Sequence, residues 1–156
     1  MIASLYVPYV LRESHTLNVL QSRTHGLDHW WRVWKNAEIL VRKEITADLE
    51  VVALFALFHD SMRVSDRDDP DHGVHGYELW ERVRQLHGHD VLAQRQREVF
   101  FEACAEHNQG LKSKDPTIAV CWDADRLDLP RLGIWPDVHV MSTPAARDLT
   151  INRPPK

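Results

Sequence analysis

The chain has 156 residues, of which 44% are hydrophobic and 27% charged, and its net charge is -4 at pH 7. This composition is typical of a single globular domain and argues against disorder. The mild acidity argues against binding to a nucleic-acid polymer. No segment reaches the roughly 18 apolar residues of a membrane span, and Met1–Leu11 lacks the basic start of a signal peptide. We therefore expect a cytoplasmic protein with no membrane partner.

Apolar residues recur with a helical period along most of the chain, and no alternating strand pattern is present. The pattern predicts an all-α bundle of about six helices within residues 1–134, followed by an irregular, partly mobile tail over 135–156. Asp28 and Thr46 are expected N-caps, and Asp115-Pro116 is a capping residue followed by proline at the first helical position. The expected helices cover residues 14–23, 28–43, 46–60, 74–87, 90–107 and 115–129, with a loop over 61–73.

Histidine and cysteine are the residue types that could carry unusual chemistry. Ten histidines are many for this length. The two cysteines, Cys104 and Cys121, have no C-x-x-C spacing and lie in apolar, helix-like stretches. We expect both to be reduced, buried thiols rather than parts of a disulfide framework or a four-thiolate zinc site.

Three of the expected helices each bring a metal-binding side chain to the stripe that faces the core. His29 lies on the second helix, His59 and Asp60 end the third, and Asp125 lies on the sixth. Burying such groups without partners costs on the order of several kcal/mol, and one divalent cation would satisfy them all. Two imidazoles and two carboxylates suit Mn, Fe, Co, Ni, Zn or, less well, Mg. Four protein ligands also leave positions for water and substrate, as catalytic sites do.

Each of these residues alone has a plain structural explanation, but their order resembles the HD-domain superfamily of metal-dependent phosphohydrolases. The family pattern selects His29 rather than His25, and Asp125 rather than Asp123. The resemblance implies an HD-type bundle around the metal and hydrolysis of a phosphate ester or anhydride, with Asp60 and His59 as catalytic residues. The matching segments are HGLDHWWRV (25–33), LFHD (57–60) and DADRLD (123–128), within a similarity over about residues 22–133.

The resemblance leaves the number of metal ions open. In binuclear members, histidines at positions such as His72 and His107 hold a second ion. The alternative is that both residues surround a single ion or bind phosphate. The loop between Asp60 and His72 is shorter than in the binuclear phosphodiesterase branch, which slightly favours one ion.

Three further residues are candidates for substrate binding. The frequent family signature His-Asp-x-Gly-Lys is not met, because residues 59–63 read HDSMR, and this argues against the cyclic-dinucleotide phosphodiesterase branch. Arg63, at the lysine position, could clamp a phosphate or pair with the acidic loop. His25 could contact substrate or cap a helix, and Arg126 could pair with Asp60 or with substrate. The acidic residues of the loop that could pair with Arg63 are Asp66, Asp68 and Asp69.

The sequence thus predicts a phosphomonoesterase or nucleotidase-like hydrolase of a small phosphorylated compound, with a nucleotide as one candidate. Two alternatives belong to other classes. An HD-type diiron oxygenase requires His72 and His107 as ligands, and a non-catalytic sensing module would not need the intact ligand set. Loops 61–73 and 108–116 contain no recognition motif, so the substrate stays unassigned.

Overall fold

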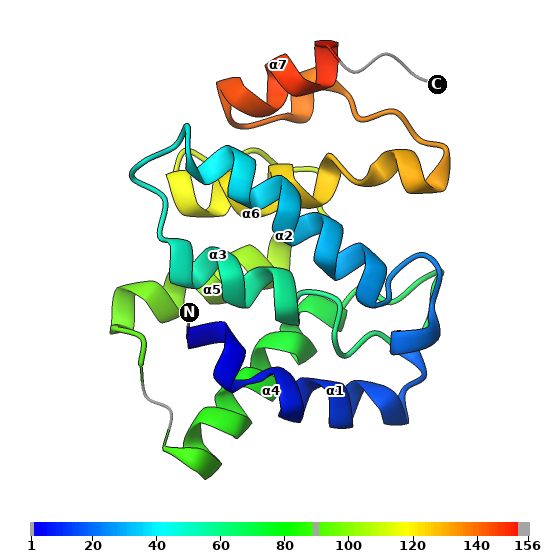
Figure 1. The fold of residues 1–156 in the computed structure, drawn as a ribbon, viewed down its shortest axis with the longest axis vertical. Coiled ribbons are helices and arrows are strands. Elements are labelled where there is room, and N and C mark those ends of the chain that lie inside the picture. Colours follow the sequence, from blue (N-terminus) through cyan, green and yellow to red (C-terminus); the bar gives the residue numbers. More distant parts are fainter. Residues whose placement is uncertain (1, 89–90, 153–156) are drawn as a thin grey trace.

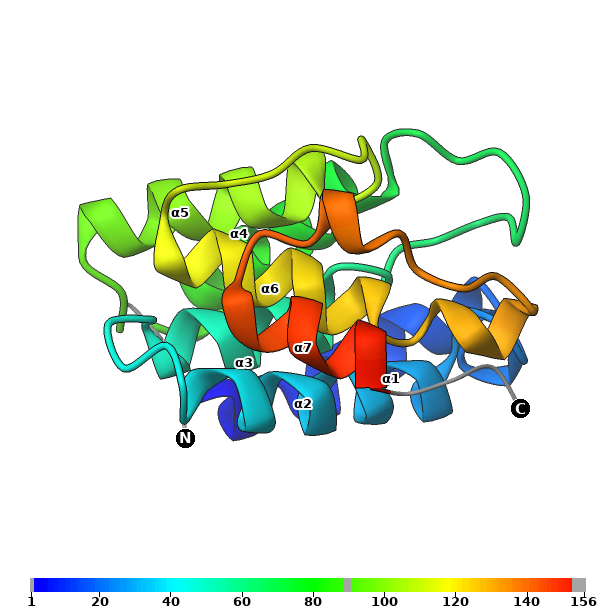
Figure 2. The same cartoon turned by 90° about the horizontal axis from the view of Figure 1, so that it is seen from above.

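The computed structural model describes residues 2–88 and 91–152, and over these residues it contains helices and no strand. In Figure 2, α4 and α5 lie on one side of the bundle and α1 and α2 on the other, with α3 and α6 between them. The prediction of an all-α fold is confirmed. Its elements are η1 (Ile2–Leu5), α1 (Val7–Thr16), η2 (Val19–Gln21), α2 (Leu27–Val41), α3 (Leu49–Phe58), α4 (His72–His87), α5 (Gln94–Glu106), α6 (Pro116–Arg126), η3 (Leu129–Leu132), η4 (Val138–Val140) and α7 (Pro144–Asn152).

Helix α3 is the centre of the bundle (Figure 1). It contacts α1, α2, α4, α5 and α6, and its sequence LEVVALFALF is apolar on every face, as expected of a helix surrounded by others. Asp48 caps it by accepting hydrogen bonds from the backbone N–H groups of Glu50 and Val51, so the cap is Asp48 rather than the expected Thr46. The C-terminal end of this helix delivers His59 and Asp60 to the interior.

Capping residues and glycine explain where the helices begin, although two N-caps differ from the predicted residues. Asp115 accepts from two backbone N–H groups and Pro116 follows it, so the predicted start of α6 is confirmed. The N-cap of α2 is Gly26, and Asp28 lies in the first turn, where its charge favours the helix dipole. A Cβ at Gly26 would lie 2.4 Å from the carbonyl oxygen of Ser22, which explains the glycine.

Helix α1 and the start of helix α5 also differ from the predicted positions. The first α-helix spans Val7–Thr16 and not residues 14–23, because Pro8 lies in its first turn, where proline starts a helix rather than breaking it. The expected start of the fifth helix, Asp90, lies outside the described residues. Helix α5 begins at Gln94, and the Gln96 side chain accepts a hydrogen bond from the backbone N–H that precedes the helix.

The expectation of an irregular tail is wrong, because residues 138–140 and 144–152 are helical. The segment has few apolar residues at helical spacing, so its pattern gave little signal. Instead the buried carboxylate of Asp123 accepts from the backbone N–H groups of Ser142 and Thr143, at 2.9 and 2.7 Å. Arg126 adds a hydrogen bond to the Val140 carbonyl. The tail is therefore held by polar contacts to α6 and by the fully buried side chains of Met141 and Ala146.

Two glycines allow α4 to approach its neighbours closely. A Cβ at Gly73 would lie 2.0 Å from the carbonyl oxygen of Cys104 in α5, and one at Gly76 would lie 2.1 Å from that of Phe58 in α3. No side chain fits at either position without moving a helix. These contacts bring the start of α4 beside the ends of α3 and α5.

The structure also describes the two cysteines and the apolar content of the helices. Cys104 and Cys121 are both buried free thiols, as predicted, and burial raises the pKa of each above its usual range. Among the described residues, no helix combines the length and the apolar run that a membrane crossing requires.

Candidate metal centre

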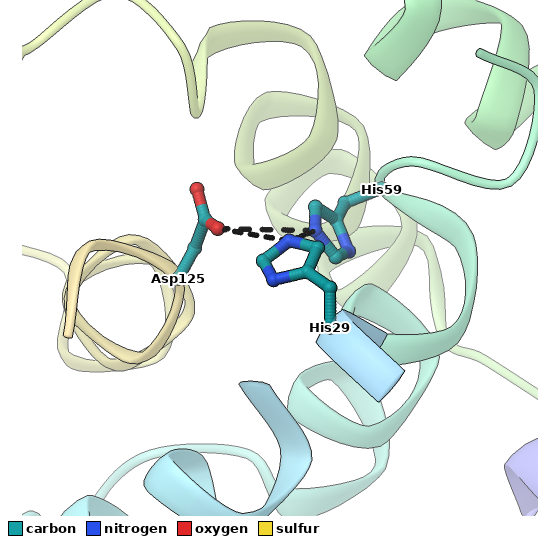
Figure 3. A group of neighbouring side chains, drawn as sticks. All are labelled: His29, His59 and Asp125. Atoms are coloured by element: carbon teal, nitrogen blue, oxygen red, sulfur yellow. Dashed lines mark hydrogen bonds and ion pairs between the residues drawn. The ribbon is translucent and has the colours of Figure 1, made fainter. Parts of the chain in front are cut away.

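The ends of three helices bring His29, His59 and Asp125 together in the interior (Figure 3). The Nε2 atoms of His29 and His59 are 3.1 Å apart. Asp125 Oδ1 lies 3.3 Å from His29 Nε2 and 4.0 Å from His59 Nε2. Both imidazoles are at most 1% exposed, whereas the Asp125 side chain is 18% exposed. We call these three residues the first group.

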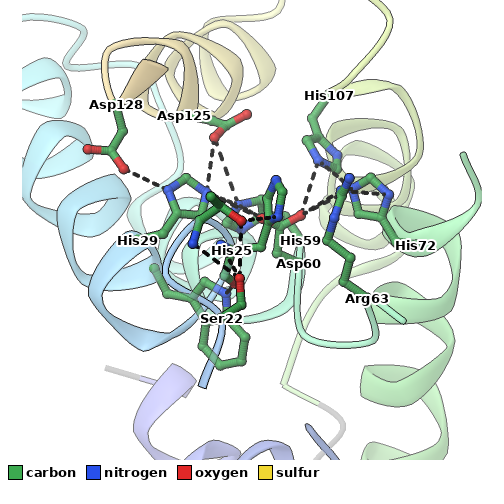
Figure 4. Close-up of polar contacts among 12 residues, drawn as sticks. Ser22, His25, His29, His59, Asp60, Arg63, His72, His107, Asp125 and Asp128 are labelled. Carbon is green, nitrogen blue, oxygen red and sulfur yellow. Dashed lines mark hydrogen bonds and ion pairs between the residues drawn. The ribbon is translucent and has the colours of Figure 1, made fainter. Parts of the chain in front are cut away.

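A second group consists of Asp60, His72 and His107. Asp60 Oδ1 lies 3.1 Å from His72 Nε2 and 3.8 Å from His107 Nε2. Its other oxygen, Oδ2, lies 3.3 Å from His29 Nε2 and 3.5 Å from His59 Nε2. One carboxylate therefore faces both groups, with one oxygen toward each, as Figure 4 shows.

All four histidines present Nε2 to these groups and Nδ1 to a hydrogen-bond acceptor outside them. When Nδ1 donates its proton in this way, the neutral ring keeps a lone pair on Nε2, which is the form that binds a metal ion. The Nδ1 acceptors are Asp128 Oδ2 for His29, and the carbonyl oxygens of Phe55, Asp69 and Cys104 for His59, His72 and His107.

This arrangement fits a divalent cation. Within each group two Nε2 atoms face each other, at 3.1 Å in the first and 3.0 Å in the second. Two lone pairs at that distance repel, so the contact requires a proton or a metal cation between the two nitrogens. Imidazole nitrogens and carboxylate oxygens are also a donor set that transition-metal ions favour. The residues present in both groups could thus hold a cation.

The pKa values show how strongly the carboxylates favour positive charge here. Burial by itself lowers the pKa of His29, but hydrogen bonds to Asp125, Asp128 and Asp60 outweigh it and raise the pKa to about 10. Burial dominates at His59 and lowers its pKa to about 3. Burial alone raises the pKa of Asp60, but the surrounding imidazoles reverse this and hold it well below its usual range. The carboxylate of Asp60 therefore stays ionised.

Asp128 belongs to the site although the sequence analysis did not select it. Its Oδ2 accepts from His29 Nδ1 at 2.7 Å, and its Oδ1 accepts from Arg32 Nε, also at 2.7 Å. It thereby fixes the ring orientation and tautomer of His29, as carboxylates beside metal-binding histidines commonly do. Its spacing of three residues from Asp125, one helical turn, is the signal that could have identified it.

Two candidates for substrate binding lie outside both groups. His25 Nδ1 contacts Asp66 Oδ1 at 2.8 Å, which joins the segment before α2 to the loop after Asp60. Arg126 donates to the carbonyls of Val140 and Leu111 rather than pairing with Asp60. Both side chains have structural contacts that explain their placement.

Arg63 does reach the second group. Its Nη1 lies 2.8 Å from His72 Nε2 and 3.5 Å from Asp60 Oδ1. The ion pair with Asp60 differs from the two expected roles, a phosphate clamp and a salt bridge to the acidic loop. Arg63 also lines an open pocket of about 270 Å³, together with residues of segments 17–22 and 64–66.

The fold and the two groups define an all-helical protein with candidate metal sites. The model of one family, the HD domain, matches residues 26–129. The chain therefore belongs to the HD-domain superfamily of metal-dependent phosphohydrolases. It matches no curated protein and no solved structure.

Proposed function

We propose that the protein is a phosphomonoesterase or nucleotidase-like hydrolase that uses a divalent ion held by His29, His59, Asp60 and Asp125. The observation that carries this proposal is the convergence of these four side chains, with each histidine fixed as a metal-binding tautomer. The HD domain over residues 26–129 supports the reaction class. A small phosphorylated compound, with a nucleotide as one candidate, is the proposed substrate.

The ion, when bound, would supply a Lewis acid that activates water and offsets charge on the phosphoryl oxygens. The residues of the chain perform the remaining tasks. Asp60 stays ionised, so it can accept a hydrogen bond from the attacking water and orient it. Asp128 holds His29 in position through Nδ1. Asp125 is the most exposed of the four proposed ligands, which suggests that the substrate approaches over this carboxylate.

A diiron oxygenase is the second candidate, since the structure brings all six donors together, including His72 and His107. The Arg63 guanidinium argues against it, because its positive charge lies 2.8 Å from His72 Nε2, one of the nitrogens that would bind iron. Iron analysis and a visible absorption band after iron loading would distinguish the oxygenase. The intact donor set likewise argues against a non-catalytic sensing module.

A phosphatase screen tests the proposal directly. Nucleoside monophosphates, sugar phosphates and p-nitrophenyl phosphate are assayed with Mn, Co, Ni and Mg. We expect turnover with at least one metal and substrate, and its loss in Asp60→Asn, which keeps the shape of the side chain but removes its charge. Asp68→Asn, on the exposed loop, is the matched control and should keep full activity. Absence of turnover with every metal, or full activity of Asp60→Asn, would refute the hydrolase.

A further inference from the structure

The side chain of Arg63 already places a positive charge beside the second group. Arg63 Nη1 lies within hydrogen-bond distance of His72 Nε2, at 2.8 Å, and forms an ion pair with Asp60 Oδ1 at 3.5 Å. These two atoms are also two of the three donors that the second group offers to a metal ion. The guanidinium thus competes with an ion for the same atoms (Figure 4).

At His72 the guanidinium lies against the imidazole ring, with Arg63 Nη1 2.8 Å from Nε2 and 3.1 Å from Nδ1. The His72 Nδ1 faces the carbonyl oxygen of Asp69, so the ring proton is on Nδ1 and the only lone pair is on Nε2. The nearby guanidinium charge repels a divalent cation that would bind this lone pair. A metal ion would have to approach Nε2 to about 2.0–2.1 Å, beside the positively charged guanidinium.

Arg63 is held in this inward position by the loop that follows Asp60. Its Nε donates to the carbonyl of Ser65 at 2.9 Å and its Nη2 to the carbonyl of Arg67 at 3.1 Å. Only 11% of the side chain is exposed. Two backbone acceptors behind the guanidinium and two site atoms in front of it fix the planar group, as suits the fork geometry of arginine.

We infer that Arg63 takes the place of a second metal ion, so that the protein binds one divalent ion, at the first group, and excludes another from Asp60, His72 and His107. This inference rests on the proposed metal site and assigns its stoichiometry. Arg63 supplies a single fixed positive charge beside Asp60, where a second ion would bring two. Removing the guanidinium leaves three donors that face one another, which is a second binding site.

The test measures metal content without substrate, so its outcome is separate from that of the phosphatase screen. Metal-free protein is titrated with Mn²⁺ and analysed by calorimetry and by elemental analysis after dialysis. We expect one ion per chain in the unchanged protein and two in Arg63→Ala. The electron paramagnetic resonance spectrum should change from that of an isolated Mn²⁺ to that of a spin-coupled pair. Arg63→Met, which fills the space without a donor, should behave like Arg63→Ala and serves if the alanine variant does not fold.

Two controls define what would overturn the inference. Arg67→Ala removes a positive charge from the same loop, at an exposed side chain, and should still bind one ion. Arg63→Ala combined with His72→Ala should return to one ion. Two ions in the unchanged protein, one ion in both Arg63 variants, or no ion in any of them would each overturn the inference.

Discussion

Replacing Gly73 with alanine should separate α4 from α5 and disturb the second group. The added Cβ would lie 2.0 Å from the Cys104 carbonyl oxygen, whereas real Cβ contacts are essentially never shorter than 3.0 Å. The helices must therefore move apart by at least about 1 Å, since backbone cannot rotate away as a side chain can. His72 precedes Gly73 directly, so its distance of 3.0 Å from His107 should increase by a similar amount.

The expected loss of stability is a balance of two terms. Overpacking of this severity costs up to about 3 kcal/mol, and the better helix propensity of alanine returns at most about 1 kcal/mol. The net loss of about 2 kcal/mol should lower Tm by roughly 4–8 °C in a domain of this size. Thermal unfolding of the metal-free protein measures it, and nitrogen-15 NMR of the imidazole rings should show changed signals for His72 and His107.

Gly88→Ala is the matched control for Gly73→Ala. Gly88 has a φ of 69° and open space around its Cβ position, so alanine costs about 1–2 kcal/mol through backbone strain alone. It should lower Tm without altering the imidazole signals of His72 and His107. An unchanged Tm in Gly73→Ala, together with unchanged imidazole signals, would refute the argument that this glycine sets the spacing of the second group.

Two further predictions concern the first group. Asp128→Ala should weaken binding of Mn²⁺ by about 10–100-fold, because His29 loses the acceptor of its Nδ1 proton. Calorimetric titration measures this, and an unchanged affinity would contradict the positioning role of Asp128. A divalent ion at 100 times its dissociation constant should stabilise the folded protein by about 2.7 kcal/mol, because the unfolded chain has no site. Chelation should reverse the resulting rise in Tm, and Asp60→Asn should show little rise; an equal rise in that variant would place the ion elsewhere.

Much of the candidate site could be predicted because its residues occupy regular positions on helices. His29 and Asp125 lie on core-facing stripes, and His59 and Asp60 follow directly from the end of the apolar run in α3. These positions depend on the helical period, which the sequence displays. The all-α fold and the start of α6 at Asp115 were predictable for the same reason.

The contacts of Arg63 and the tail could not be predicted, since they depend on the path of irregular segments. Arg63 reaches His72 only because the backbone of Ser65 and Arg67 turns behind it. The C-terminal segment is held in part by hydrogen bonds from backbone N–H groups to a buried carboxylate, and such bonds produce no periodic pattern in a sequence. The start of α1 at Val7 was not predicted either, because a proline can begin a helix as well as interrupt one.

The hydrogen bonds from the tail to Asp123 determine where the smallest fragment that can form the candidate metal site ends. Asp123 and Asp125 share one turn of α6, so the carboxylate that holds the tail and the carboxylate that belongs to the first group move together. A fragment cut at residue 134 would keep every residue matched by the family model. It would also strip two hydrogen bonds from a buried charge next to the site. Deletion mapping by metal binding should therefore place the C-terminal boundary of this fragment beyond Thr143, outside the residues that the family model matches.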